Sequence, residues 1–464
     1  MKTKYLNLLI VTIALFFATS CIDEILDKDP ISSFAGDGFY KVEGDAQVGV
    51  YGIYDAVQGA FSQNFAYWGE GRADNVMTQT SAVGEGLALT TNILDANLGS
   101  SNWSGLYLII SRANYAIKYI PTVFATENTT SKQLIGQSKA LRALAYFYLV
   151  RVWGDVPLIT EPYTSMDQDL YVKRADKELV LNQVEEDLKY AAENCLKTFS
   201  GSNDRIMFTQ GSANGLLTQV YMWRKKYAEA VTTSSLVTGN TLYSLAATIT
   251  DWAKIFTNSY QSESIFEIGY NDTETNQLRG IYAIGGSAVF VPSAKFKSTY
   301  ETGDLRIDYV YDVTQVTVRA IWKYLGKGVS DAVATPSKNN IVLIRLADIM
   351  LLRAEALNKL GGTANKTEAL SLLNTIRKRA GIPLFATEAE AITKYGDLEN
   401  AILHERSVEL CFEGHRWFDL VRTGKAISTM KPINNLTDER NLVWPILQLN
   451  LSKNPNLVQN EFYK

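Results

Sequence analysis

Apolar residues recur with a helical period along most of this chain. Leu141, Leu144, Tyr148 and Val152 are spaced so that they fall on one face of a helix, and alanines beside them allow a second helix to approach closely. Gly154 follows, with a proline three residues later, which is a typical end of a helix. The pattern therefore predicts a deeply buried helix that ends at Gly154.

Two further stretches predict pairs of helices joined by short turns. The first pair covers about 216–239 with a turn at 225–226, and the second covers 346–381 with a turn at 361–362. Tyr227 and the alanine three residues after it are similar to the pattern of tetratricopeptide repeats, although the repeat period is irregular. Because stacked helix pairs bury a face that neither helix buries alone, we expect a solenoid-like helical core.

The character of the sequence changes between residues 261 and 340. Residues 265–270 look strand-like, and residues 310–324 are rich in Val, Tyr and Thr with loose alternation, so strands are expected there. Residues 61–101 carry several glycines and are expected to form loops, where binding residues tend to lie. The predicted fold is mainly α, a tetratricopeptide-like scaffold of helical pairs with an irregular, partly β loop insertion.

The first twenty residues have the layout of a secretory signal. Lys2 and Lys4 precede an apolar run of about eleven residues, and small residues then lead into Cys21. A helix that crosses a bilayer needs about 20 apolar residues, so a permanent transmembrane anchor is the weaker alternative. A cysteine directly after the small residues suggests a lipoprotein signal, in which residues 1–20 are removed and Cys21 is acylated.

The segment after Cys21 is acidic and resembles the surface-export signal of bacterial lipoproteins. Residues 21–35 are therefore expected to be a lipidated tether at the outer membrane, with an ordinary solvated linker as the alternative. A single acyl chain binds a membrane only marginally, so several chains are needed for a stable tether. The remaining residues, 36–464, are expected to form one domain with its helical core at about 36–260 and 341–464 and the insertion at about 261–340.

Composition excludes several classes of function. With 46% hydrophobic residues the chain can bury a large core, and a net charge of −4 without a block of like charge gives no argument for nucleic acid. His404 and His415 are the only histidines, so a histidine-based zinc site or a Ser-His-Asp triad is hard to assemble. Cys195 and Cys411 match no metal-ligand spacing and are expected to be buried free thiols. No cofactor or metal is predicted.

Six motifs follow one another along the chain. They are RALAYFYLVRVWGDVP at 142–157, Pro292 and Ser293 followed by Asp304 and Arg306, RLADIMLLRAEALN at 345–358, IRKRAG at 376–381, ERSVELCFEGHRWFDLVRTG at 405–424 and NPNLVQN at 454–460. Together with the lipoprotein start, they resemble the SusD/RagB family of nutrient-binding outer-membrane lipoproteins, in the same order and over nearly the whole chain.

This resemblance implies a function as well as a fold. It implies a tetratricopeptide-like helical scaffold, an oligosaccharide or polysaccharide as ligand, and a SusC-like TonB-dependent transporter beneath the protein as partner. The protein would then capture glycan at the cell surface and pass it on for uptake, without catalysis. A peptide-binding role, a scaffold for protein partners and a surface glycosidase remain as alternatives.

The densest motif places three carboxylates at intervals of four residues. Glu405, Glu409 and Glu413 share a helical stripe, where like charges destabilise an isolated helix, so cations are expected to face them. Such a buried charge network is favoured over two carboxylates that hydrolyse a glycoside. The candidate partners are Arg406, Arg416, Arg422, Arg377 and Arg379.

A glycan site needs exposed aromatic rings with polar side chains alongside, because sugar rings have apolar faces and polar edges. The loop at residues 65–75 combines both kinds of group within eleven residues, on either side of flexible glycines. The expected stacking platforms and polar contacts are Tyr67, Trp68, Arg72, Asp74 and Asn75. A purely structural role for this loop is the alternative.

Four further aromatic residues are candidate ligand contacts. Trp103 stands at the start of the next predicted helix, and Tyr270 and Tyr282 lie among glycines and asparagines of the insertion. Trp322 is expected to share one face of a strand with Tyr324. For each of them, packing in the core is the alternative.

Overall fold

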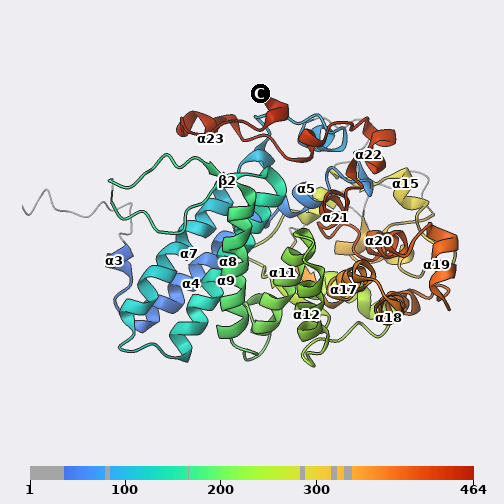
Figure 1. The fold of residues 1–464 in the computed structure, drawn as a ribbon, viewed down its shortest axis with the longest axis horizontal. Helices are drawn as coiled ribbons and strands as arrows, with labels where there is room; N and C mark the ends of the chain where they lie inside the picture. The colour runs from blue at the N-terminus through green and yellow to red at the C-terminus, as the bar shows by residue number, and fades with distance from the viewer. Residues whose placement is uncertain (1–35, 79–83, 166, 283–287, 315–320, 329–336) are drawn as a thin grey trace, which may run out of the picture.

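The structure is a computed structural model of the chain. It describes residues 36–464 except 79–83, 166, 283–287, 315–320 and 329–336 (Figure 1). The predicted signal sequence, Cys21 and the tether lie outside the described residues. None of the helices that the structure describes is both long and apolar enough to cross a membrane.

A series of helices, each packed against the next, forms the body of the molecule (Figure 1). Apolar residues at helical spacing bury one face of each helix against its neighbours. The predicted helix pairs and the solenoid-like core are confirmed. In packing order the series is α4 (Glu43–Phe61), α7 (Ser104–Val123), α8 (Thr129–Trp153), α9 (Lys177–Asn194), α11 (Gln210–Trp223), α12 (Tyr227–Thr238), α17 (Leu346–Leu360) and α18 (Thr363–Ala380).

Helix α8 is the central element of the N-terminal half. Asn128 caps its start, because the side chain accepts a hydrogen bond from the Ser131 amide, and Gly154 ends it with a φ of 75°. The predicted burial and the predicted end at Gly154 are both confirmed. The final segment of the chain closes over this end, where the Trp444 amide donates to the Val152 carbonyl oxygen at 2.8 Å.

Shorter helices follow the series along the chain: the first of them lie beside its C-terminal helices, and the last run back over the end of α8 (Figure 1). They are α19 (Glu388–Tyr395), α20 (Leu398–Glu409), α21 (Arg416–Arg422), α22 (Ala426–Asn434), the 3₁₀ turn η3 (Glu439–Leu442), α23 (Gln448–Lys453) and η4 (Glu461–Tyr463).

Three small antiparallel sheets join distant parts of the chain. In the longest sheet Phe266 lies opposite Ile344, so the two ends of the segment 261–340 are brought together. The predicted strand near residue 265 is confirmed. The pairs are β4 (Ser264–Ile268) with β6 (Ile341–Arg345), β1 (Val76–Met77) with β5 (Val291–Pro292), and β2 (Val156–Pro157) with β3 (Arg174–Ala175).

The predicted strand at 310–324 is wrong in the part that the structure describes. This region contains α16 (Ile307–Val310) and the 3₁₀ turn η2 (Trp322–Tyr324), so Trp322 and Tyr324 do not share a strand face. The Lys323 ammonium is buried and donates to the Cys411 carbonyl oxygen at 2.9 Å, a tertiary contact that the local sequence pattern does not record. Loose alternation of Val and Thr does not form a strand without a partner strand.

Residues 61–101 contain more helix than the glycines suggest. The expected loops include α5 (Asn64–Gly69), α6 (Glu85–Thr90) and the 3₁₀ turn η1 (Gly99–Ser101), so this prediction is partly wrong. The remaining short helices are α3 (Gly36–Phe39), α10 (Asn203–Ile206), α13 (Ile249–Thr257), α14 (Leu278–Tyr282) and α15 (Ala294–Lys297).

Candidate functional site

The predicted glycan loop at 65–75 is a short helix and a turn that pack inside the molecule. Trp68 is only 1% exposed, and its indole N–H donates to the Ser100 carbonyl oxygen at 2.9 Å. Tyr67 is also buried and meets Phe290 edge-on, and burial raises the pKa of its hydroxyl to about 12. The expectation that these rings are exposed platforms is therefore wrong, while their part in ligand binding stays a prediction.

Backbone contact explains why this segment is buried. A Cβ added at Gly69 would overlap the carbonyl group of Gly414, so α5 and the turn after α20 touch backbone to backbone. Glu70, the next residue, is buried, and its carboxyl group accepts from the Gly414 amide at 3.2 Å. The flexible glycines of this segment serve close packing.

The polar residues of the same segment are also held inside. The Arg72 guanidinium donates to the Asn92 side chain at 2.6 Å and lies over the Trp417 ring. Asp74 accepts from the Arg416 guanidinium at 2.7 Å, and Asn75 donates to Glu70 at 3.4 Å. Their hydrogen bonds stabilise this segment of the fold.

The other four candidates occupy separate places. The buried Trp103 ring lies 5.8 Å from that of Trp153, and Tyr282 is fully buried and stacks on Tyr324 at 5.6 Å. Neither ring is exposed. Trp322 is half-buried. Tyr270 is 7% exposed, and its hydroxyl donates to the carbonyl oxygen of Gln58 at 2.8 Å.

Two of the predicted residues meet at a groove between α4, the end of α5 and the start of α7. The groove has a volume of about 680 Å³, within the range of about 300–1,000 Å³ that is usual for ligand sites. We call it the α4–α7 groove. Its lining residues are Asp55, Ala56, Gln58, Gly59, Ala60, Ser62, Gln63, Asn64, Trp68, Gly99, Asn102, Gly105, Leu106, Leu108, Tyr270, Glu274 and Thr275.

Glycines shape this groove in two ways. A Cβ on Gly105 would lie 3.1 Å from the Cβ of Ala60, so α4 and α7 cross closely and fix the position of the floor. A Cβ on Gly59 would meet nothing within 4 Å, so the groove stays open above that residue. A rigid floor and an open centre suit a ligand that lies along the groove.

The lining is rich in amides and hydroxyls. The Asn64 amide donates to the Ala60 carbonyl oxygen at 3.0 Å, whereas its own side-chain oxygen is buried and has no hydrogen-bond partner among the described residues. Gln63 and Asn102 are exposed, and Leu108 adds an apolar surface that is 46% exposed. The groove can therefore exchange hydrogen bonds with ligand hydroxyls and cover an apolar ring face.

Two carboxylates are the charged groups of the lining. Asp55 accepts from the Arg112 guanidinium at 2.7 Å, and Glu274 accepts from the Asn271 amide at 2.9 Å. Among the described residues that line the groove, neither a lysine nor an arginine occurs.

Sequence reasoning missed most of these residues. Asp55 and Gln58 of α4 and Ser62 directly after it are spaced by three and four residues, which places them in one polar stripe. That stripe is a usable signal, but a polar stripe is also the normal solvent face of a helix. Only the position of α7 beside it makes a groove.

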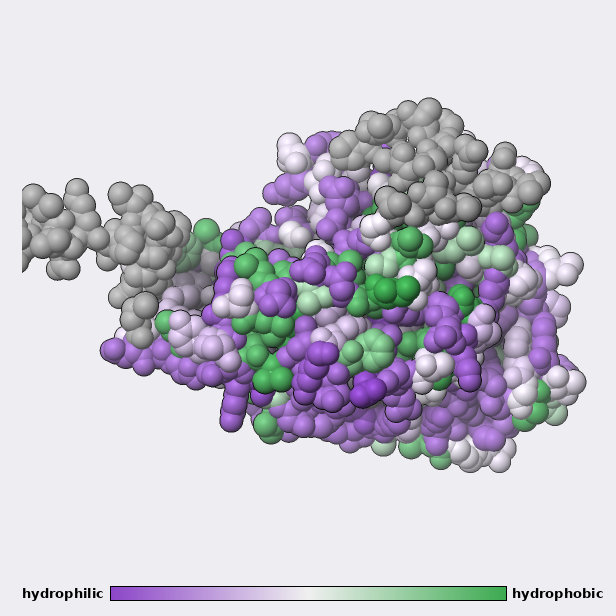
Figure 2. Space-filling model, turned by 90° about the horizontal axis from the view of Figure 1, so that it is seen from above, coloured by the Kyte–Doolittle hydropathy of each residue, from purple (hydrophilic) through white to green (hydrophobic). Residues whose placement is uncertain are grey.

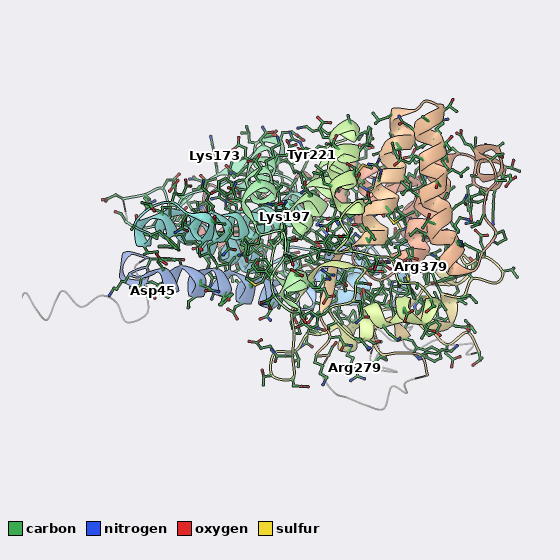
Figure 3. The ribbon with its side chains drawn as sticks, turned by 90° about the horizontal axis from the view of Figure 1, so that it is seen from below. Asp45, Lys173, Lys197, Tyr221, Arg279 and Arg379 are labelled. Atoms are coloured by element: carbon green, nitrogen blue, oxygen red, sulfur yellow. The ribbon has the colours of Figure 1, made fainter. Side chains whose placement is uncertain are left out.

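The three glutamates of the densest motif lie in a buried charge network. Helix α20 ends at Glu409, and Phe412 has a φ of 65°, so Glu413 does not continue the helical stripe as predicted. Burial alone would raise the pKa of Glu409, but the guanidinium groups of Arg379 and Arg345 outweigh it and hold this pKa well below its usual range. Figure 3 labels Arg379 near the end of α18.

The partners of this network were predicted only in part. Arg377 pairs with Glu405 at 3.3 Å and Arg379 pairs with Glu409, as expected. The other three expected cations pair elsewhere: Arg406 with Asp348 and Asp419, Arg416 with Asp74, and Arg422 with Glu355 and Asp419. The missed partners are Arg306, Arg345 and Lys323, which come from distant parts of the chain.

Comparison with known families places two family models on this sequence. The model of the SusD family matches residues 260–463, and a model described as starch-binding associating with outer membrane matches residues 26–222. SusD-like protein P38 of Formosa agariphila is 32% identical over 98% of both chains. A SusD-like protein of Bacteroides ovatus is 26% identical over 91% of this chain and 82% of its own.

Solved structures give the same picture of the fold. A SusD superfamily protein of Bacteroides thetaiotaomicron is 27% identical and covers 92% of this chain and 99% of its own, with a TM-score of 0.75. A laminarin-binding SusD-like protein is 24% identical, covers 91% of this chain and 100% of its own, and has a TM-score of 0.77.

Proposed function

Because the chain belongs to the SusD family, we propose that it captures an oligosaccharide or polysaccharide in the α4–α7 groove and hands it to a transporter for uptake. The observation that carries this proposal is the groove itself, about 680 Å³ in volume and lined by amides, hydroxyls and one exposed leucine. Sugar hydroxyls need such donors and acceptors, and no reactive group is required. The related laminarin-binding protein supports a carbohydrate as the ligand.

The state of the clustered carboxylates supports binding without catalysis. Glu405 and Glu409 are buried and accept hydrogen bonds from the Arg306 guanidinium at 2.6 and 2.9 Å. A glycosidase needs two carboxyl groups that reach the scissile bond, one of which donates a proton. Carboxylates fixed in ion pairs inside the molecule cannot take either role, which supports a non-enzymatic function.

We further propose that the protein is tethered to the outer membrane by lipid on Cys21 and faces outward. The family model for residues 26–222 is described as associating with the outer membrane, which supports this location. Residues 21–35 span at most about 50 Å when extended, since each residue contributes about 3.3–3.6 Å. A tether of that length would hold the domain close to the membrane, beside a SusC-like TonB-dependent transporter, the partner that the family resemblance implies.

A substitution that fills the α4–α7 groove tests the proposed function. Gly59→Phe adds a ring to open space, so it should fill the groove without disturbing the packing. We expect binding to at least one glycan of a panel that includes laminarin, starch and xylan to fall by tenfold or more. Affinity electrophoresis of the purified full-length protein in detergent measures this, with oligopeptides as competitors to test a peptide ligand.

Gly44→Phe is the matched control, because it adds the same ring to the same helix at another open position. It should leave glycan binding unchanged. Equal binding by the Gly59→Phe variant and the wild type would contradict the groove as the site. The exposed side chains of Met77 and Leu87 would then be the next to replace by alanine.

A further inference from the structure

The charged lining residues of the α4–α7 groove have the same sign of charge. Asp55 and Glu274 are its charged lining residues among those that the structure describes, and both are acidic. Asp55 and Glu274 lie in separate parts of the chain, one on α4 and the other after β4. A ligand that lies along the groove is therefore close to two carboxylates and to no ammonium or guanidinium group of the lining.

Two cations close to these parts of the chain are already paired with carboxylates. Arg112 donates to Asp55 and also to the carbonyl oxygen of Gly52, so its guanidinium offsets part of the charge of Asp55 and is not free to bind an anionic ligand. Lys338 pairs with Asp272 at 2.8 Å, two residues before Glu274. Glu274 itself accepts from an uncharged amide, and no lysine or arginine within the described part of the chain forms an ion pair with it.

From this arrangement we infer that the groove takes uncharged saccharides and rejects those that carry carboxylate or sulfate groups. The inference rests on the proposed function, because it names the class of glycan that the same site accepts. Acidic sugars are recognised by arginine or lysine, whose charged hydrogen bonds to carboxylates and sulfates are strong. A site that instead presents carboxylates opposes an anionic ligand by like charge, which is a form of specificity by repulsion.

The carboxylates of the lining do not repel a neutral sugar. Their hydroxyls donate to carboxylates and amide oxygens and accept from amide N–H groups, all of which the lining supplies. Acidic sugars also carry hydroxyls, so hydrogen bonding does not separate the two classes of ligand, and the difference between them rests on charge.

The test compares neutral and acidic oligosaccharides of equal length. Laminariheptaose and maltoheptaose serve as neutral probes, and heptagalacturonate and a sulfated maltoheptaose serve as acidic probes, each titrated calorimetrically into the full-length protein in detergent at low salt. We expect at least one neutral probe to bind tenfold or more tightly than both acidic probes. The Asp55→Asn/Glu274→Gln double variant should narrow that ratio at least threefold, chiefly by strengthening the acidic probes.

The matched control is Asp438→Asn/Glu461→Gln, which makes the same change in net charge at exposed sites near the C-terminus. It should leave the ratio unchanged. Acidic probes that bind as tightly as neutral ones, and whose binding is lost in Gly59→Phe, would overturn this inference and leave the proposed function standing. If Gly59→Phe changes the binding of no saccharide, the groove is not the site and both proposals fail.

Discussion

At the scale of single residues, Glu70 carries an unusual charge state. Its carboxyl group is buried beside the turn at Gly414, and that burial raises its pKa to about 8 despite the nearby Arg416 and Lys323. The group is therefore mainly protonated at neutral pH in the folded protein. In the unfolded chain it has its ordinary pKa of 4.5 and is ionised.

This difference predicts a pH dependence of stability. Between pH 4.5 and 8 the folded state binds more protons at Glu70 than the unfolded state does, so the free energy of unfolding falls as pH rises through this window. The contribution is at most about 1.4 kcal/mol per pH unit. Glu70→Gln should remove it, so that urea unfolding at pH 5, 6, 7 and 8 shows a flatter profile than the wild type. Parallel profiles would show that Glu70 does not titrate in this way.

At the scale of elements, glycines decide how closely helices approach. Gly69 is the last residue of α5 and Gly59 lies within α4, so both have a helical backbone conformation. The atoms around them differ. Gly69 faces the backbone of Gly414, whereas Gly59 faces open space.

Alanine at these two positions should therefore have opposite effects. Gly69→Ala overlaps a backbone carbonyl group that has no free rotation, so we expect a loss of about 1–3 kcal/mol or more in the free energy of unfolding. Gly59→Ala should raise it by up to about 1 kcal/mol, because alanine favours the helix. Chemical unfolding followed by circular dichroism measures both. Similar effects of the two substitutions would mean that α5 does not pack as described.

The elements that the sequence predicts well are those with local signals. Gly154 and Gly381 directly follow α8 and α18 and have a positive φ. Glycine adopts a positive φ without strain, so it marks the end of a helix in the sequence. The expected strand near Trp322 failed because a strand needs a partner, and Lys323 there makes a buried tertiary contact instead. The residues that indicate a helix lie within a few positions of one another. A strand also depends on a partner strand, which can be far away in the sequence.

At the scale of the whole molecule, one buried charge network ties distant segments together. Glu409 at the end of α20 accepts from Arg345 at the end of β6 at 2.7 Å and from Arg306 at 2.9 Å, and it also meets Arg379 of α18. Trp252 of α13 donates to the same carboxylate at 2.8 Å. The helical series and the segment 261–340 therefore share a single ion-paired junction.

Removal of this carboxylate should destabilise the entire protein. Glu409→Ala leaves three buried guanidinium groups without their shared partner, and we expect a loss of about 3–5 kcal/mol. Glu368→Ala is the matched control, because Glu368 pairs with Arg353 near the surface, where a salt bridge contributes about 0–1 kcal/mol. Thermal unfolding of both variants checks this, and a loss for Glu409→Ala as small as that of the control would contradict the junction.

The distribution of polar and apolar side chains on the surface does not by itself indicate where a ligand binds. Hydrophilic residues cover much of the face shown in Figure 2, and apolar side chains gather in patches among them. Trp68 and Tyr67 illustrate why sequence reasoning misplaced the platforms. Their residue types suit sugar stacking, but exposure depends on the contact of Gly69 with a residue 345 positions later.

The sequence alone determined the family, the mainly helical fold, the helix pairs and several helix ends, because periodic apolar residues and glycines act within a few residues of themselves. Only the tertiary structure decided which of the candidate side chains face solvent, since Gly69 meets Gly414 and α4 meets α7 through contacts that no local pattern records. The same holds for the partners of Glu409. Burial is a property of the packed chain, and it is burial that separates a binding residue from a structural one.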